Sequence, residues 1–167
     1  ALGRVAVVDW DVHHGNGTES IFYDRADVLT ISLHQENLFP ANSGHFSARG
    51  NDSGKGYNLN IPLLPGGGEQ SYIYAFEKMV LPSLRAFAPN MIIVASGLDA
   101  SGFDPLASMQ LHSNAYRKLT EMILGTADEL CQGKLVLVHE GGYSESYVPF
   151  CGLAIMETLV EKHTDVE

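Results

Sequence analysis

The residues best suited to chemistry follow the first apolar run of the chain. Asp9, Asp11 and His13 alternate within the segment Asp-Trp-Asp-Val-His-His-Gly-Asn-Gly-Thr. If an extended backbone continues through this segment, the two carboxylates and the imidazole lie on one side. Adjacent carboxylates repel each other unless a cation or a proton lies between them. The spacing therefore predicts a metal site.

A further carboxylate follows a later apolar run. Asp99 lies in the segment Ser-Gly-Leu-Asp-Ala-Ser-Gly-Phe-Asp-Pro. Asp11, His13 and Asp99 would supply three ligands and leave one position open, which is typical of catalytic zinc. Oxygen-rich ligation also leaves iron, cobalt or manganese open. A lone Asp-x-Asp is as often a simple turn, but the His-His-Gly that follows favours the metal.

A tyrosine follows the last apolar run, in His-Glu-Gly-Gly-Tyr at 139–143. The glycines let the backbone pass close to a ligand, and Tyr143 could donate a hydrogen bond to an oxyanion. Taken alone, Gly-Gly-Tyr fits a plain turn better. Two other positions are open to two interpretations: Ser32 holds a monovalent cation or caps a strand end, and Phe39 walls an apolar channel or plugs its own loop.

Buried strands and amphipathic helices must position these residues. Continuous Val, Ile and Leu runs predict strands buried on both faces. Apolar residues at three- and four-residue spacing predict helices, the first kinked or divided by Pro82. Strands that alternate with helices indicate an α/β fold, a mostly parallel sheet with helices on both faces. Its ligands should bind at the carboxyl ends of the strands. The expected strands are 4–8, 28–33, 91–96 and 134–139, the helices 69–88 and 113–131, and a long loop covers 35–56.

Composition limits the class of protein. With 167 residues, 45% of them hydrophobic, the chain fits a single domain over 1–167. Ten Lys and Arg against twenty Asp and Glu, with a net charge of -10, argue against direct nucleic-acid binding. Two unpaired cysteines suit the reducing cytoplasm, and no apolar run is long enough to span a membrane. Because the sequence has no initiator Met or leading polar segment and is inside an apolar strand by Val5, we expect an incomplete domain.

The motifs together resemble a known family. The segment 8–18, then Ser32-Leu33-His34, Gly97-Leu98-Asp99 and Glu140-Gly141-Gly142-Tyr143, resemble the catalytic core of the zinc-dependent histone deacetylase and acetylpolyamine amidohydrolase superfamily. With Pro-Phe-Cys-Gly-Leu-Ala at 149–154, the chain is similar to the class II branch and its bacterial deacetylase-like amidohydrolases. The resemblance covers nearly the whole chain.

The resemblance implies a fold and a set of site residues. The fold would be the C-terminal part of an arginase-like α/β domain, with Zn²⁺ on Asp11, His13 and Asp99. Tyr143 would polarise the acetyl carbonyl. A K⁺ site would use Asp9, Ser32 and Leu33 with the backbone of Asp11 and His13, and the substrate channel would use Phe39, Gly97, Gly141 and Gly142.

The implied reaction is hydrolysis of N-acetyl-lysine side chains or similar acetylated amines, which releases acetate through a zinc-activated water. The family's upstream Gly-His-His pair, its general base and acid, is not in this chain, so we expect weak activity from the chain alone. An acetylated polyamine is an alternative substrate that suits an acidic surface. An arginase-like dimanganese hydrolase, with Asp104 as an additional ligand, and an inactive metal-binding module are further alternatives. A homo-oligomer is left open.

Overall fold

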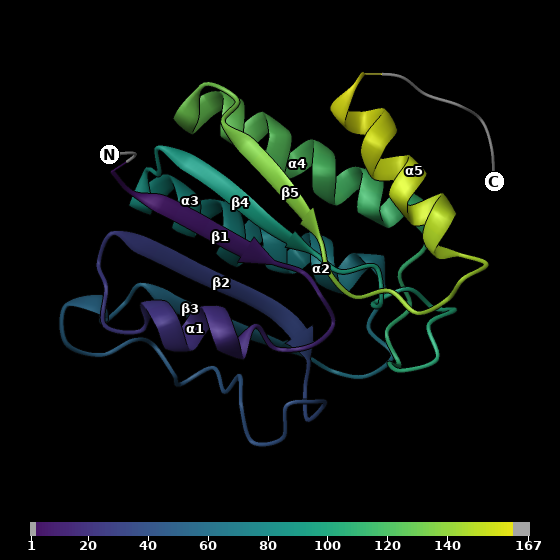
Figure 1. Cartoon of the computed structure of the whole chain (residues 1–167), viewed down its shortest axis with the longest axis horizontal. Helices are drawn as coiled ribbons and strands as arrows, with labels where there is room; N and C mark the ends of the chain where they lie inside the picture. Colours follow the sequence, from purple (N-terminus) through teal and green to yellow (C-terminus); the bar gives the residue numbers. More distant parts are fainter. Residues whose placement is uncertain (1–2, 162–167) are drawn as a thin grey trace.

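All strands of the computed structural model, which describes residues 3–161, run parallel in one sheet (Figure 1). The strand order is β3-β2-β1-β4-β5. Each predicted apolar run forms a strand, and the α/β class is confirmed. Residues 1–2 and 162–167 of the expected domain lie outside the described residues. The strands are β1 Val5–Asp9, β2 Val28–Gln35, β3 Asn58–Leu63, β4 Met91–Ser96 and β5 Leu135–His139.

Strand β3 was not predicted, because its residues have weak strand signals. Asn58 and Asn60 alternate with apolar residues, and Pro62 has no N–H for the ladder. The strand lies at the edge of the sheet and pairs only with β2, where a missing donor is tolerated. Both asparagines donate side-chain hydrogen bonds of 2.7 Å to Glu19 on the neighbouring helix. A tertiary contact therefore stabilises a strand that local propensity does not favour.

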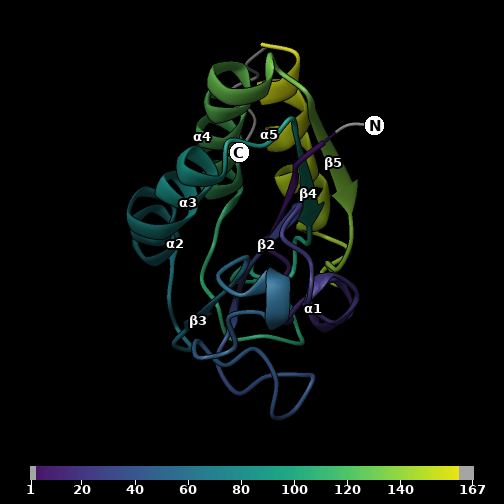
Figure 2. The same ribbon diagram turned by 90° about the vertical axis from the view of Figure 1, so that its left-hand side faces the viewer.

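Helices cover one face of the sheet, and a short helix lies on the other (Figure 2). The covering helices are α2 Glu69–Ala75, α3 Leu81–Phe87 and α4 Ser113–Cys131, whereas α1 Asn16–Phe22 lies opposite them. Helix α5, Val148–Leu159, packs against α4 beyond the β5 edge. The core lies between the sheet and the covering helices. Its largest fully buried side chains include Trp10, Tyr72, Phe76, Ile92 and Tyr116.

The helix expected at 69–88 is not divided at Pro82. A π-helical turn, Phe76–Val80, joins α2 to α3, and Pro82 lies in the first turn of α3. Proline cannot donate to the carbonyl four residues earlier, and a π turn is one way to absorb that loss without ending the helix. Helices α1 and α5 were not predicted. No helix of residues 3–161 has the length and apolar character that a membrane crossing requires.

The register aligns the carboxyl ends of the strands. Asp9 of β1 pairs with Ser32 of β2 and with Ala95 of β4, and Ser96 pairs with His139 of β5. The chain leaves β1 toward β2 and later returns to the other side of β1 as β4. This reversal makes the point between β1 and β4 the topological switch point, where open α/β sheets bind ligands.

Candidate metal centre

A bend after β1 positions the first candidate ligands. The strand ends at Asp9, so the condition that an extended backbone continues through His13 is not met. Instead, Asp9 Oδ1 accepts the N–H of Asp11 at 3.0 Å, and Asp11 Oδ1 accepts the N–H of His13 at 2.9 Å. Short acidic side chains often close turns by bonding the backbone two residues on. These two hydrogen bonds therefore bring Asp9, Asp11 and His13 close together through a turn, whereas the sequence suggested that an extended strand would do so.

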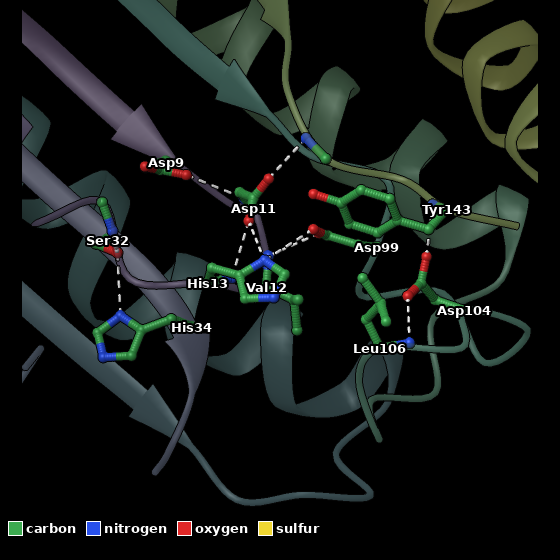
Figure 3. Close-up of polar contacts among 12 residues, drawn as sticks. Asp9, Asp11, Val12, His13, Ser32, His34, Asp99, Asp104, Leu106 and Tyr143 are labelled. Carbon is green, nitrogen blue, oxygen red and sulfur yellow. Dashed lines mark hydrogen bonds and ion pairs between the residues drawn. The ribbon is translucent and has the colours of Figure 1, made fainter. Parts of the chain in front are cut away.

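Asp11, His13 and Asp99 converge on one point (Figure 3). One potential ligand atom from each residue lies within 4.8 Å of the others. His13 Nδ1 lies 3.0 Å from Asp11 Oδ1 and 3.1 Å from Asp99 Oδ2. The other oxygen of Asp99 accepts the N–H of Val12 at 2.8 Å, which fixes the carboxylate. An imidazole nitrogen and two carboxylate oxygens are a donor set that zinc binds.

The electrostatics of this cluster fit a cation. Burial, reinforced by the charge of Asp11, raises the pKa of Asp99 to about 7. Burial and Asp11 likewise raise the pKa of Asp9 to about 8. Carboxyl groups with raised pKa values indicate negative charge that the protein alone does not neutralise. A divalent cation held by Asp11, His13 and Asp99 would neutralise it, so the residues present fit a metal ion.

Glycines bring the backbone against the two ligand carboxylates. A Cβ at Gly97 would collide with the Asp11 carboxylate, and one at Gly141 would collide with Asp99 and lie 2.6 Å from Asp11 Oδ2. The N–H of Gly141 instead donates to Asp11 Oδ2 at 2.8 Å, and its carbonyl accepts the N–H of Leu98 at 2.7 Å. Glycine is required at 141 because only a residue without Cβ can approach so closely.

Tyr143 lies beside His13, with ring centroids 6.4 Å apart in an edge-on arrangement. Its N–H donates to Asp104 Oδ2 at 2.8 Å. Burial and then the charge of Asp99 raise the pKa of the Tyr143 phenol. The hydroxyl therefore keeps its proton at neutral pH and can serve as a hydrogen-bond donor.

Asp104 does not join the metal ligands as the dimanganese alternative requires. Its second oxygen accepts the N–H of Leu106 at 2.9 Å, so both oxygens bond main-chain groups. Among the residues that the structure describes, the only cluster of potential metal ligands is Asp11, His13 and Asp99. The structure therefore offers one mononuclear site. The sequence suggested Asp104 only as an additional metal ligand. Its position in the segment after an apolar run was the one sequence feature that could have indicated its bonds to the main chain of Tyr143 and Leu106.

The residues expected to bind K⁺ lie behind this cluster. Asp9 and Ser32 are register partners, and both line a small cavity of about 10 Å³. Ser32 Oγ accepts the N–H of Gly15 at 3.3 Å and lies 3.0 Å from Nδ1 of His34. Leu33 is fully buried in β2. The structure brings Asp9 and Ser32 together, and the K⁺ itself stays a prediction.

A cleft of about 810 Å³ opens over the candidate metal ligands. Of the expected channel residues, Phe39 and Gly141 line it, as do Tyr143 and Leu106. Gly97 and Gly142 lie behind it, Gly97 against Asp11 and Gly142 against Leu98. Phe39 is 73% exposed, so its ring forms part of the cleft's rim. The sequence did not point to Leu106.

His14 anchors a second polar network beside the cleft. Its ring is buried, with Nδ1 3.0 Å from Ser43 Oγ and Nε2 3.4 Å from Glu19 Oε2. Burial alone would raise the pKa of Glu19, but hydrogen bonds from His14, Asn60 and Asn58 outweigh burial and lower it to about 2. This network ties α1 to β3 and to the loop that carries Phe39.

Comparisons with known proteins agree with this geometry. The histone deacetylase domain family matches residues 1–159. The chain is 58% identical over 156 residues to a histone deacetylase-like amidohydrolase of Pseudomonas aeruginosa, covering 93% of the chain and 41% of that relative. It is 38% identical over 157 residues to a probable deacetylase of Archaeoglobus fulgidus, covering 93% of the chain and 44% of that protein.

A solved structure extends the similarity to three dimensions. The crystal structure of acetylpolyamine aminohydrolase from Burkholderia pseudomallei superposes with a TM-score of 0.86 at 32% identity. The match covers 93% of this chain and 44% of that one. The chain thus spans less than half the length of these relatives.

Proposed function

The chain belongs to the histone deacetylase domain family, and from this premise we propose that it carries the metal-binding part of an amidohydrolase that releases acetate from acetylated amines. The convergence of Asp11, His13 and Asp99 beneath an open cleft is the observation that carries the proposal. Because the chain spans 41% of its Pseudomonas relative, we assign the complete reaction to a protein of the relatives' length.

In this proposal Asp11, His13 and Asp99 hold a zinc ion. Zinc bound there would polarise the acetyl carbonyl and lower the pKa of a water molecule. The chain orients the two carboxylate ligands through the backbone: Val12 donates to Asp99, and the N–H groups of His13 and Gly141 donate to the two oxygens of Asp11. Such outer contacts hold ligand side chains in a fixed orientation. We assign Asp9 and Ser32, with the main chain at Leu33, to a K⁺ that would offset the negative charge behind the site.

Tyr143 has the second role in the proposal. When water adds to an amide carbonyl, negative charge develops on the carbonyl oxygen. The phenol lies at the cleft, beside His13, and its raised pKa keeps the proton available for donation. We assign Tyr143 as the hydrogen-bond donor to this oxyanion, and Phe39 and Leu106 as apolar walls for the methylene chain of the acetylated amine.

Two substrate classes fit the cleft. We propose N-acetyl-lysine in a peptide first, because relatives from Arabidopsis thaliana and Schizosaccharomyces pombe carry the name histone deacetylase. An acetylated polyamine is the second candidate, supported by the structural match to an acetylpolyamine aminohydrolase and by the net charge of -10. The ratio of kcat/KM for an acetyl-lysine peptide and for acetylspermidine, measured on the full-length protein, separates the two.

The test of the proposed function combines metal analysis with catalysis. The full-length protein should contain one zinc per chain and release acetate from an acetyl-lysine peptide. Asp99→Asn should lose the metal and the activity, because Asp99 supplies a buried ligand oxygen. The exposed Asp24 provides the matched variant Asp24→Asn, which should change neither. Full metal content in Asp99→Asn would remove Asp99 from the site, and no metal in the parent protein would refute the assignment.

A further inference from the structure

Asp104 is a buried carboxylate outside the metal cluster that contacts the main chain of two loops. It is 8% exposed and lies in the loop after β4. Its oxygens accept the N–H of Tyr143 at 2.8 Å and the N–H of Leu106 at 2.9 Å (Figure 3). Hydrogen bonds to an ionised acceptor are about twice as strong as neutral ones. One side chain thereby joins the loop after β5 to the loop after β4.

Tyr143 has few other contacts that could hold its phenol. Within residues 3–161 its hydroxyl has no hydrogen-bond partner, and the residue is 49% exposed. Its ring meets His13 only edge-on, at 6.4 Å. The position of the phenol therefore depends on its backbone.

The residue before Tyr143, Gly142, takes part in no main-chain hydrogen bond within residues 3–161. Both main-chain polar groups of Gly141 are hydrogen-bonded: its N–H donates to Asp11, and its carbonyl accepts the N–H of Leu98. Gly142 follows with φ 138°, a conformation that side-chain-bearing residues rarely adopt. The next main-chain anchor is the turn in which Ser144 accepts the N–H of Tyr147 at 3.0 Å. Among the residues that the structure describes, the bond to Asp104 is thus the one hydrogen bond at Tyr143 itself.

We propose that Asp104 is a positioning residue that fixes Tyr143, and with it the phenol, over the metal ligands. The inference rests on the proposed function of Tyr143. Because the same carboxylate holds Leu106, Asp104 also sets the separation between the phenol and the apolar wall of the cleft. Asp104 does not contact the substrate in this proposal and acts through the two residues that do.

The test replaces Asp104 by Asn in the full-length protein. The amide keeps one acceptor oxygen and presents an N–H₂ group to the other backbone N–H, so one anchor is lost. Amide hydrogen exchange over 141–147 should become about tenfold faster, whereas exchange over 5–13 and the zinc content should not change. Turnover should fall about 10- to 100-fold, the usual cost of losing an orienting partner. Asp24→Asn is the matched control.

A double-mutant cycle asks whether Asp104 acts through the phenol. In a Tyr143→Phe background, Asp104→Asn should reduce kcat by less than about twofold, because there is no hydroxyl left to misplace. An equal loss in both backgrounds, or unchanged exchange over 141–147, would overturn the proposal. Full turnover in Tyr143→Phe would instead refute the proposed role of Tyr143. Amide hydrogen exchange over 141–147 would still show whether Asp104 holds the backbone of Tyr143.

The wild-type protein provides a measurement that does not depend on any variant folding. If Asp104 anchors Tyr143, the amide of this half-exposed residue should exchange at least about 100-fold more slowly than in an unstructured chain. Exchange at the unstructured rate would contradict the proposal even if Asp104→Asn cannot be purified.

Discussion

The main-chain N–H of Gly141 donates a 2.8 Å hydrogen bond to Oδ2 of Asp11, a residue 130 positions earlier in the chain. This contact joins the loop after β5 to a candidate metal ligand after β1. It requires the absence of a side chain at 141, because a Cβ there would collide with the carboxylates of both Asp99 and Asp11. The floor of the cleft and the candidate metal ligands therefore form one unit.

Gly141→Ala should disrupt that unit. The added methyl group must displace Asp99 or Asp11, so we expect zinc affinity to fall by about 10- to 100-fold, as for other changes that misorient ligands. Competition with a chromophoric chelator measures the affinity. Gly125→Ala is the control: this glycine lies within α4 with open space around it, so alanine should stabilise the helix by about 0.5–1 kcal/mol. Unchanged zinc affinity in Gly141→Ala would contradict the close approach.

The metal-free protein should lose stability as the pH rises from about 6.5 to 8. Asp99 and Asp9 have pKa values of about 7 and 8 in the folded chain and 3.8 as model values. The folded chain therefore holds more protons than the unfolded chain in this window, and stability falls as they leave. Below pH 6.5, His34 acts oppositely, because burial lowers its pKa from 6.5 to about 4.

Thermal melts of chelator-treated protein at pH 6.5, 7.25 and 8 measure this dependence. Added zinc should reverse the slope, because metal binding needs deprotonated ligands and so strengthens with pH. Asp99→Asn should flatten the metal-free slope. A melting temperature that rises with pH in the metal-free protein would count against the buried-carboxylate interpretation.

Glu19→Gln should destabilise the junction between α1 and β3. Glu19 accepts hydrogen bonds from Asn58 and Asn60, and the loss of the charge should lower the free energy of unfolding by about 1–2 kcal/mol at pH 7. The pKa of Glu19 is lowered from 4.5 to about 2, so its contribution is complete above pH 4.5 and disappears as the pH falls through 2. Urea unfolding at pH 7 and pH 3 measures the difference.

Glu121→Gln, at an exposed position of α4, is the control for that substitution. It should change stability by less than about 0.5 kcal/mol at either pH. If Glu19→Gln and Glu121→Gln were equally stable at pH 7, the network around His14 would have no measurable energetic role.

Phe39→Ala should weaken substrate binding without disturbing the metal. The ring lies 6.4 Å from that of His13, edge-on, and is 73% exposed, so its removal leaves no cavity in the core. In the full-length protein we expect KM for an acetyl-lysine peptide to rise about 3- to 10-fold, the effect of losing an apolar contact of about 1 kcal/mol. Phe46→Ala is matched, because Phe46 is exposed in the same loop but does not line the cleft. Equal KM values in both variants would exclude Phe39 as a wall.

The sequence alone determined the elements with strong local patterns. The Val-, Ile- and Leu-rich runs became β1, β2, β4 and β5. The expected burial on both faces holds along β2 but is wrong for the edge strand β5, where Val136 and Val138 are exposed. The same logic placed Asp9, Asp11 and Asp99 at strand ends, and the motifs identified the family. The strands, the acidic residues after them and the family motifs all consist of residues close together in the chain. The local sequence pattern was therefore sufficient to predict them.

Tertiary structure alone decided which of these residues meet and which contacts hold them. Nothing in the order of residues shows that Gly141 bonds Asp11, that Asp104 bonds Tyr143, or that the weak strand β3 is held through Glu19. The strand order places β1 between β2 and β4, and only this order brings loops more than a hundred residues apart in the chain to one edge. These hydrogen bonds form because folding brings donors and acceptors from distant parts of the chain together. Their positions depend on the packing of the whole sheet and its helices, which local propensity does not encode.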